Sequence, residues 1–523
     1  MKKHLFLSAI GLALSLQVSA QCDTTDVSGD MIINSSTYLS GVYRVTGKFQ
    51  VNSGKTVFVQ AYEVNGCGKL EVIADEIIID GTINGDFAGY QGGNGGAPGQ
   101  NAMSLTGDAI AINTCNNKDN TGIVQLEGGK KGALGQGPGA GSLASDGGIG
   151  SGPKQQCLSN DDEPGMIGGS GGAGGGAGAG YGGSGGNGGT GGAGASDYTA
   201  TGLDVSSAYP VVGGVAGTGG TAGSSYGTLS GTDIEMGSSG AGAGGAGRSF
   251  DTGLAGGNGG SGGGLVILRA ESNLNVTGTI SVNGENGEAG AQGGNGGESP
   301  KCCSDGCDDC GEATLSTGAG GSGGAGGGSG GGVLLISDGE AVVTGTISTN
   351  GGDGGIGGSH GNGTSCDYSA TFCGSQTLIS ANGSNGQEGG GGSGGRIKVF
   401  VPICSNATVT PTTILTGGTG AHNGAEGTYF LGCSELSLME SNFDFKLNLF
   451  PNPANQIVHL TSSKIIENAE LILMDMSGRI VYSAIANLSS EAIQIAVSEL
   501  SSGTYQLSIN GSGVNVVKKL IKY

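Results

Sequence analysis

The sequence predicts an all-β protein with two parts, a glycine-rich repeat body and a small C-terminal β-sandwich. Glycine supplies 120 of the 523 residues and charged residues only 12%, a composition unlike that of helical or α/β chains. No stretch between Gln21 and Ser441 has an apolar pattern of helical period. Short β-branched runs bounded by glycine and asparagine recur there instead, as expected of strands.

The chain begins with a segment typical of a signal peptide, expected over residues 1–20. A basic start precedes the apolar run 5–16, and Val18-Ser19-Ala20 offers the small residues that signal peptidase reads. The apolar run is shorter than the ~20 residues that span a bilayer. Acylation of Cys22 is an alternative, although Gln21 is an unusual residue before a lipidated cysteine.

The body, residues 21–440, repeats a unit of two strands followed by a glycine-rich excursion. Copies of the unit occur at residues 69–85, 262–284, 330–351 and 394–414. Ile280, Ile347 and Ile414 follow one another at equal intervals, so we expect them to align. Apolar runs without a polar face suit strands buried between stacked neighbours, and repeats that bury their faces by stacking form solenoids. The unit therefore predicts a parallel β-helix-like body; the alternative is a twisted antiparallel β-sandwich.

The excursions have a period of three residues. Gly-Gly-Asn-Gly-Gly occurs at residues 92–96, 256–260 and 293–297, and residues 182–192 keep the same period. Polyproline II has three residues per turn, so each third residue would lie on one edge with bare backbone on the other two. We therefore expect polyproline II-type loops, packed through weak Cα–H···O contacts. Flexible linkers without fixed structure are the alternative.

In composition and period the body resembles glycine-rich repeat surface proteins. The same Gly-Gly-X pattern is found in polyproline II bundles of phage adhesins and of the springtail antifreeze protein. This resemblance implies a fold for the loops and does not specify a function.

Beyond Ser441 the composition changes to that of an ordinary sandwich. Seven apolar or alternating runs, separated by turn signals, lie at residues 447–450, 457–460, 469–474, 480–482, 492–497, 504–509 and 514–521. That number of short strands in about 80 residues is typical of an immunoglobulin-like sandwich. Residues 441–523 are therefore predicted to be a separate β-sandwich domain.

Four motifs in this domain occur in order: Phe450-Pro451-Asn452-Pro453-Ala454-Asn455, Met474-Asp475-Met476-Ser477-Gly478-Arg479, Leu500-Ser501-Ser502-Gly503-Thr504-Tyr505 and Val517-Lys518-Lys519-Leu520-Ile521-Lys522. They resemble the type A C-terminal sorting domain of the type IX secretion system. The resemblance implies that the sorting motif is carried by Pro451, Asn452, Pro453, Asp475, Gly478, Gly503, Tyr505, Lys518 and Lys519. It further implies recognition by an outer-membrane translocon, cleavage near the domain start and attachment to surface lipopolysaccharide. An ordinary immunoglobulin-like adhesion module is the alternative.

The net charge is −22, from 21 Lys and Arg against 43 Asp and Glu. Such a surface repels nucleic acid and anionic membranes, and it suits a protein outside the cell. We expect no cofactor, although loosely bound Ca²⁺ is compatible with this charge. Tryptophan is absent and aromatic residues make up 5%, which disfavours a sugar platform built on stacked rings.

Twelve cysteines in an exported chain predict disulfides. The expected pairs are Cys22–Cys67, Cys115–Cys157, Cys366–Cys373 and Cys404–Cys433. A dense cluster, also expected to form disulfides, consists of Cys302, Cys303, Cys307 and Cys310. A zinc or iron site is the alternative for this cluster, because thiolates at these separations can ligate either metal.

No catalytic or metal-binding residue is predicted. The mature histidines His360, His422 and His459 do not pair at metal-ligating spacing, and no nucleophile elbow lies between a strand and a helix. Acidic groups occur in two polar loops, at Asp161, Asp162, Glu163, Asp305, Asp308 and Asp309. Solvated loop acids are the common case, although carboxylates in one loop can collect Ca²⁺.

The sequence therefore predicts a secreted or cell-surface structural or adhesive protein, non-catalytic and exported by the type IX system. Expected partners are the translocon, surface lipopolysaccharide and an extracellular polysaccharide or another cell surface, but not nucleic acid. The alternative is a carbohydrate-active β-helix enzyme, a lyase or glycosidase whose acids converge in one groove. A lesser alternative, ice binding, is suggested by Thr277-Gly278-Thr279 and Thr344-Gly345-Thr346.

Overall fold

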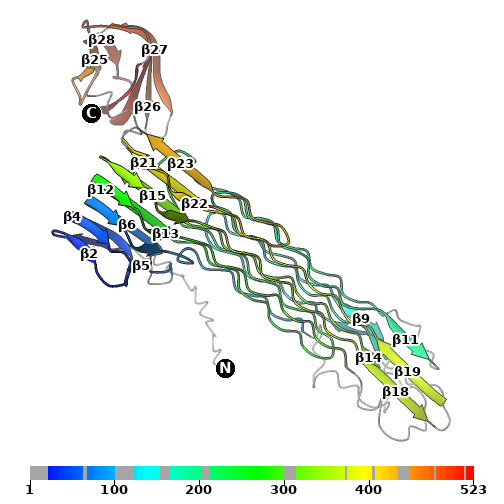
Figure 1. Cartoon of the computed structure of the whole chain (residues 1–523). Helices are drawn as coiled ribbons and strands as arrows, with labels where there is room; N and C mark the ends of the chain where they lie inside the picture. Colours follow the sequence, from blue (N-terminus) through cyan, green and yellow to red (C-terminus); the bar gives the residue numbers. More distant parts are fainter. Residues whose placement is uncertain are drawn as a thin grey trace, which may run out of the picture. The chain divides into compact units, whose positions relative to one another are not determined.

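The computed structural model describes residues 22–62, 67–100, 123–153, 165–201, 211–297, 314–370, 374–402, 407–433, 447–463, 465–475, 479–511 and 514–523. The chain divides into two compact units, Met1–Cys433 and Ser434–Tyr523. Within the described ranges every regular element is a β-strand, which confirms the all-β prediction (Figure 1). The predicted signal peptide and the predicted domain boundary at residues 440 and 441 lie outside these ranges.

The first unit contains a ten-stranded sheet, here called the wide sheet, in which all pairs are parallel. Its path runs β1-β4-β6-β12-β15-β20-β23, with β2, β16 and β21 alongside. The strands are β1 Thr24–Val27, β2 Met31–Ile33, β4 Gly41–Val51, β6 Lys69–Ile79, β12 Leu265–Val276, β15 Gly332–Ser337, β16 Ala341–Val343, β20 Arg396–Val401, β21 Thr408–Val409 and β23 Thr428–Cys433. Parallel pairing favours the stacked-repeat interpretation over the antiparallel alternative.

A second parallel sheet, here called the narrow sheet, has six strands in the order β22-β17-β13-β7-β5-β3. Its strands are β3 Thr37–Leu39, β5 Thr56–Val59, β7 Thr82–Asn84, β13 Thr279–Ser281, β17 Thr346–Ser348 and β22 Thr412–Ile414. Each follows a wide-sheet strand after a short connection, such as Thr277-Gly278 between β12 and β13. One repeat therefore contributes a rung to each sheet.

The core of the first unit lies between the two sheets. Strand β6 alternates buried and partly exposed residues, so one face of the strand is turned inward. Leu70, Val266, Val333 and Ile397 lie in register on successive strands, and all four are fully buried. Because burying such a side chain contributes about 1.5–3 kcal/mol, each rung depends on its neighbours for most of its stability.

The predicted register is correct for one pair of rungs and wrong for the next. Ile280 pairs with Ile347, as expected. Ile347, however, pairs with Thr413, and Ile414 lies one position further along, where it is partly exposed. Leu265 pairs with Gly332, and Gly332 pairs with Arg396. The distance along the sequence is three residues shorter for the second pair than for the first. The later excursion is therefore shorter by one three-residue period, and two extra residues before β21 restore most of the interval.

The glycine-rich excursions are ordered and pack side by side in what we call the glycine bundle (Figure 1). The bundle comprises residues 89–100, 127–149, 168–197, 213–225, 237–264, 283–297, 317–331, 349–363, 381–395 and 415–427. Segments far apart in sequence run along one another, so almost all their contacts are long-range. An extended glycine-rich chain cannot satisfy its own backbone groups, and these neighbours supply the partners.

The hydrogen bonds of the bundle repeat every three residues, the period predicted from the sequence. Along residues 319–328, every third N–H donates toward the same side of the segment, at 2.9–3.1 Å. One row donates to carbonyls of residues 285–294, a second to residues 384–390, and the third to Ser170, Ala173 and Ala241. Successive N–H groups thus point in three directions around the axis, as in a three-fold polyproline II helix.

Glycine is required in the bundle because the backbones themselves are in contact. A Cβ atom on Gly326 would overlap the carbonyl oxygen of Ala177, and one on Gly321 would overlap that of Gly358. Neither glycine has a positive φ, so close packing sets the requirement here. The intervening positions accept only small side chains, such as the fully buried Ser322 and Ala325.

Three small sheets lie at the end of the bundle remote from the wide and narrow sheets (Figure 1). They consist of β8 Ile123–Leu126 with β9 Gly150–Pro153, β10 Gly165–Ile167 with β14 Thr314–Ser316, and β11 Tyr198–Thr201 with β18 Ser365–Ala370 and β19 Gly374–Ser380. Met166, Leu315 and Leu378 are buried together there. This small apolar cluster holds the far end of the bundle together.

The second unit has a three-stranded and a four-stranded antiparallel sheet. The first contains β24 Leu447–Phe450, β25 Ile457–Ser462 and β28 Ile493–Ala496, and the second β26 Ile466–Asp475, β27 Ile480–Leu488, β29 Gly503–Gly511 and β30 Val514–Lys522. One apolar core joins them, including the fully buried Leu460, Leu473 and Leu507. Alternating apolar positions along each strand therefore face this core.

The disulfide Cys22–Cys67 is formed, with 5.5 Å between the Cα atoms, as predicted. Cys433 is also disulfide-bonded, and Cys404, its predicted partner, lies outside the described residues. Cys366 lies in β18, whereas Cys373 is not among the described residues. The same holds for Cys115, Cys157, Cys302, Cys303, Cys307 and Cys310, so the expected pairs and the zinc alternative remain predictions.

Candidate functional site

The first sorting motif lies along the last strand of the second unit. The side chain of Asn452 donates from Nδ2 to the carbonyl oxygen of Lys519 at 2.6 Å and accepts the N–H of Ile521 at 2.8 Å. Ala454 adds two backbone hydrogen bonds, donating to Ile521 and accepting from Tyr523. The carboxamide therefore acts as an extra strand residue, and with Ala454 it closes the otherwise free edge of β30. Pro451 and Pro453 flank Asn452 and are exposed.

The second motif forms the turn between β26 and β27. The carboxylate of Asp475 accepts the backbone N–H of Arg479 at 3.1 Å and its Nε at 3.0 Å, and the N–H of Asp475 donates to the Arg479 carbonyl. The guanidinium is largely exposed, so the ion pair contributes at most about 1 kcal/mol. The role of the Asp475–Arg479 contacts is to fix the turn. Gly478, the other predicted residue of this motif, lies outside the described residues.

The remaining motif residues lie in β29 and β30. Tyr505 is buried, and its hydroxyl donates to the carbonyl of Ser501 at 2.8 Å, which fixes the entry to β29. Gly503 is exposed, a Cβ atom there would make only an ordinary contact with the Tyr505 ring at 3.9 Å, and nothing in the structure explains a requirement for glycine. Lys518 and Lys519 are neighbours on β30, so their side chains point to opposite faces; Lys519 is exposed and Lys518 half-buried.

Residues 448–523 match the family model of the secretion system C-terminal sorting domain. The C-terminal unit is a type IX secretion sorting domain. The sorting domain interacts with the type IX machinery, and it marks the chain for the cell surface or the extracellular space. A comparison with curated proteins found no match to the chain.

The groups considered for chemistry are dispersed or fall outside the described residues. Asp161, Asp162, Glu163, Asp305, Asp308 and Asp309 are not among the described residues. His360 bonds through Nδ1 to Asn385 at 2.6 Å, His422 contacts the Asn187 carbonyl, and His459 stacks on Phe450. No group of three or more metal-ligating side chains occurs in the part of the chain that the structure describes. In that part, too, no helix has the length and apolarity to span a membrane.

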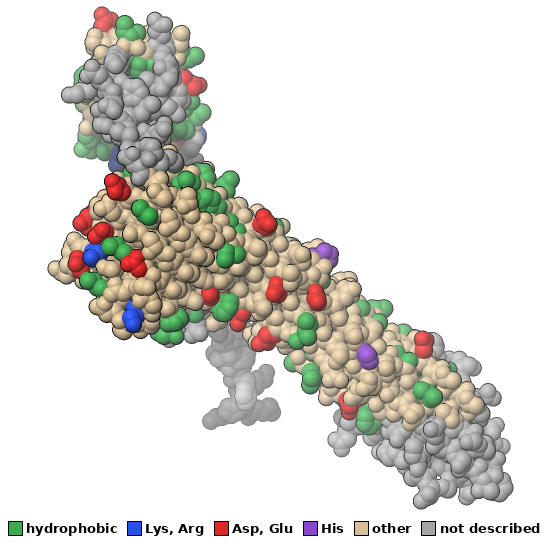
Figure 2. Space-filling view, viewed as in Figure 1, with side chains coloured by type: hydrophobic (Ala, Val, Ile, Leu, Met, Phe, Trp, Pro, Cys, Tyr) green, Lys and Arg blue, Asp and Glu red, His purple; other side chains and the backbone are tan. Residues whose placement is uncertain are grey.

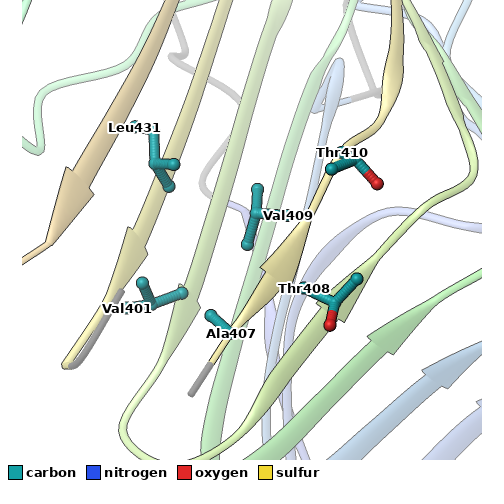
Figure 3. Close-up of a pocket in the computed structure, with 6 residues that line it drawn as sticks. All are labelled: Val401, Ala407, Thr408, Val409, Thr410 and Leu431. Carbon is teal, nitrogen blue, oxygen red and sulfur yellow. The ribbon is translucent and has the colours of Figure 1, made fainter. Parts of the chain in front are cut away.

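A pocket lies beside β23, the last strand on the path of the wide sheet within the described residues (Figure 3). It has a volume of about 320 Å³ and is lined by Val401, Ala407, Thr408, Val409, Thr410 and Leu431. Leu431 is in register with the buried Val399, yet it is exposed, because β23 is an edge strand in the part of the chain that the structure describes. The lining carries methyl groups and hydroxyls but no titratable side chain, so it provides contact surface and no general acid or base.

A buried cationic network, not predicted from the sequence, joins Tyr181 of the bundle and the connecting residues 226–235 to strand β20 of the wide sheet. Lys398 is 1% exposed and donates from Nζ to the carbonyls of Gly231 and Asp233 at 2.7 and 2.5 Å, and to the Asp233 carboxylate at 3.2 Å. Burial lowers the pKa of the Lys398 ammonium. Hydrogen bonds from Thr228, and then from Lys398, hold the pKa of Asp233 well below its usual range.

Arg396 continues this network two residues earlier on β20. Its guanidinium donates to the carbonyls of Thr228 and Tyr226 at 3.1 and 2.8 Å and lies 5.6 Å from the ring centre of Tyr181. Tyr181 is fully buried, its hydroxyl accepts the N–H of Glu235 at 2.7 Å, and burial raises its pKa. The sequence pattern Arg396-Ile397-Lys398 could have predicted this network. Residues two apart in a strand share a face, so both cations lie on the face opposite the core.

The threonine pairs behind the ice-binding alternative stack in register. Thr279 and Thr346 pair on neighbouring narrow-sheet strands, and the same row continues to Thr82 and Thr412. Thr277 and Thr344, by contrast, lie in the connections between the wide and narrow sheets. Within each Thr-Gly-Thr segment, therefore, the first threonine lies in the connection and the second begins the narrow-sheet strand.

On the bundle surface, asparagine and aspartate side chains complete hydrogen bonds that the backbone leaves open. Asp86 accepts the N–H of Asn283 at 2.7 Å, Asn283 accepts that of Asn350 at 2.8 Å, and Asn350 accepts that of Thr416 at 3.0 Å. Two asparagines of the Gly-Gly-Asn units act in the same way, because Asn258 accepts the N–H of Gly95 at 3.2 Å and Asn295 that of Asn362 at 3.0 Å. Figure 2 shows scattered acidic side chains on the visible face of the bundle, with Lys and Arg near the sheets.

Proposed function

We propose that the chain is a structural or adhesive protein of the cell surface or the extracellular space, non-catalytic, delivered there by its sorting domain. In this proposal the two parallel sheets form a β-helix-like base, the glycine bundle is a polyproline II bundle, and the sorting domain is an immunoglobulin-like sandwich. The parallel pairing, the three-residue period and the two antiparallel sheets support these three assignments.

One observation carries the adhesive role. The interior of the glycine bundle is filled by backbone and by small side chains, so large and charged bundle side chains lie toward its surface or, like Tyr181, against the wide sheet. Such a bundle presents regularly spaced polar groups, about 9 Å apart along each segment. Many weak contacts with an extended ligand suit this arrangement better than a single deep site does.

The proposed partners are an extracellular polysaccharide or another cell surface, with surface lipopolysaccharide as the anchor. The net charge of −22 opposes binding to nucleic acid. Asparagine, serine and threonine on the bundle surface offer uncharged donors and acceptors, which sugar hydroxyls can pair with at little desolvation cost.

Delivery is tested by truncating the chain after Glu440 in the native host and probing periplasm, cell surface and medium for residues 21–440. We expect the truncated body to remain in the periplasm while the full chain reaches the outside. Unchanged export would contradict the dependence on the sorting domain.

Adhesion is tested separately, on whole cells that display the full chain and on cells that lack it. We expect displaying cells to bind polysaccharide-coated surfaces more strongly, and soluble residues 21–440 to compete. A catalytic role would instead appear as fragments released from the polysaccharide, and equal adhesion of both strains would refute the proposal.

A further inference from the structure

The glycine bundle is unusually rich in asparagine followed by glycine. In the first unit the described pairs begin at Asn84, Asn94, Asn187, Asn258, Asn283, Asn286, Asn295, Asn350, Asn362, Asn382, Asn385 and Asn423. In a flexible chain this dipeptide is chemically labile, because glycine leaves its backbone nitrogen unshielded. That nitrogen attacks the Asn side-chain carbon Cγ, ammonia leaves, and a cyclic succinimide forms. Water then opens the ring to aspartate or to isoaspartate, which has an extra carbon in the backbone.

The bundle holds the attacking nitrogen. After Asn283, the N–H of Gly284 donates to the Asn350 carbonyl at 2.8 Å, and after Asn350, the N–H of Gly351 donates to the Thr416 carbonyl at 2.9 Å. Ring closure requires this N–H to lose its proton and turn toward its own side chain. Both steps break a hydrogen bond inside a regular array, in which Gly284, Gly287 and Gly290 all donate to the neighbouring segment 350–356.

The bundle also holds the carbon that would be attacked. The side-chain oxygen of Asn283 accepts Ser348 Oγ at 2.7 Å and the N–H of Asn350 at 2.8 Å. That of Asn350 accepts both the N–H and the hydroxyl of Thr416, at 3.0 and 2.9 Å. Each carboxamide oxygen is thereby bonded to the next segment, and these bonds must break before the carboxamide can rotate freely. Asn423 differs, because its oxygen accepts only the N–H of Gly420 in its own turn, at 3.2 Å.

We propose that the glycine bundle protects its Asn-Gly pairs from deamidation, and that each pair reacts only when its segment opens. By this account Asn423, whose carboxamide oxygen accepts one hydrogen bond within its own turn, reacts before Asn283 and Asn350. The damaging product is isoaspartate, because its extra backbone carbon breaks the three-residue period. Ordinary aspartate is tolerated, since Asp86 occupies the position equivalent to Asn283 one repeat earlier and accepts the corresponding N–H, that of Asn283.

The test compares the full chain in native buffer and in unfolding urea, at one alkaline pH and 37 °C, with isoaspartate measured site by site by peptide mapping. Local opening of a packed segment is rare, so we expect Asn283 and Asn350 to react about 100-fold more slowly in native buffer. Asn423 should fall between these sites and the unfolded rate. Equal rates in the two buffers would overturn the proposal.

Two variants separate local protection from general foldedness. Ser348→Ala removes one of the two hydrogen bonds on Asn283, so deamidation at Asn283 should accelerate several-fold while Asn295 is unchanged. Asn350→Asp keeps the acceptor for Thr416, so its melting temperature should match that of the wild type. If Ser348→Ala accelerates all sites equally, the assignment of protection to the named contacts is wrong.

Discussion

At the scale of single residues, the polar side chains of this protein act mainly by completing backbone hydrogen bonds. Asn452 closes the edge of β30, Asn283 and Asn350 cap neighbouring bundle segments, and Lys398 binds two carbonyls under the bundle. An unmatched buried backbone group costs about 1–3 kcal/mol. Side chains that a sequence motif marks for recognition can therefore be needed first for folding, as Asn452 illustrates.

Replacing Asn452 by alanine removes two hydrogen bonds to β30 and leaves the edge of that strand held by Ala454 alone. We expect the sorting domain to lose about 1–3 kcal/mol of unfolding free energy, measured by urea denaturation of the full chain. Asn455→Ala is the matched control, because Asn455 is exposed just beyond the bonded segment, and it should change stability by less than about 0.5 kcal/mol. Equal effects of the two variants would argue against the edge-closing role.

The hydrogen bonds that Asp233 accepts from Thr228, together with its ion pair with Lys398, predict a particular sensitivity to acid. The pKa of Asp233 is below its ordinary value of 3.8 in the folded protein, so the unfolded chain takes up the proton first. The stabilisation is therefore complete above about pH 4 and is lost as the pH falls through the folded pKa. In thermal melts between pH 7 and pH 2, the melting temperature of Asp233→Asn should fall less toward acid pH than that of the wild type does. Asp26→Asn, at an exposed position of β1, should melt as the wild type does.

At the scale of elements, the bundle is governed by a three-residue period in place of a hydrophobic face. The two copies of the excursion differ by three residues, which leaves the direction of every N–H unchanged. Variation in excursion length is therefore tolerated in whole turns. A β-strand obeys the corresponding rule with a period of two, because one residue reverses its faces.

Insertions after Gly290 test this rule. One added glycine rotates the following donors, including Gly293 and Gly296, by ~120° away from their acceptors. Three added residues, Gly-Asn-Gly, restore the direction with a shift along the axis. We expect the single insertion to lower the melting temperature more than the triple one does, as measured by calorimetry. The opposite order would mean that the period does not govern packing.

At the scale of the whole molecule, delivery and proposed function reside in separate compact units. The sorting domain has its own apolar core, so changes in the body should leave export intact. The body in turn depends on stacking between rungs and on the disulfide near its N-terminal end.

Removing the disulfide tests that separation. Cys22–Cys67 closes a loop of 45 residues, for which the chain-entropy model gives roughly 4 kcal/mol. A Cys22→Ala/Cys67→Ala chain should melt at lower temperature but still reach the cell surface, judged by calorimetry and by surface labelling. Loss of export with an unchanged melting temperature would show that the two units are not independent.

The sequence alone determined the features that follow from composition, period and motif. The all-β class, the three-residue period, the Ile280–Ile347 pairing, the Cys22–Cys67 bond and the sorting domain were predicted correctly. These features are local or periodic, so a short stretch of residues carries enough information to specify them.

Only the tertiary structure decided which segments lie beside one another. Glycine presents the same bare backbone wherever it occurs, so nothing in Gly-Gly-Asn distinguishes the next copy of the repeat from a segment much further along the chain. Because the glycine-rich segments look alike in sequence, the sequence also did not predict the register shift that pairs Ile347 with Thr413 instead of Ile414. Packing against the wide sheet likewise fixed the partners of Arg396 and Lys398, because those partners are mostly backbone carbonyls, which every residue possesses.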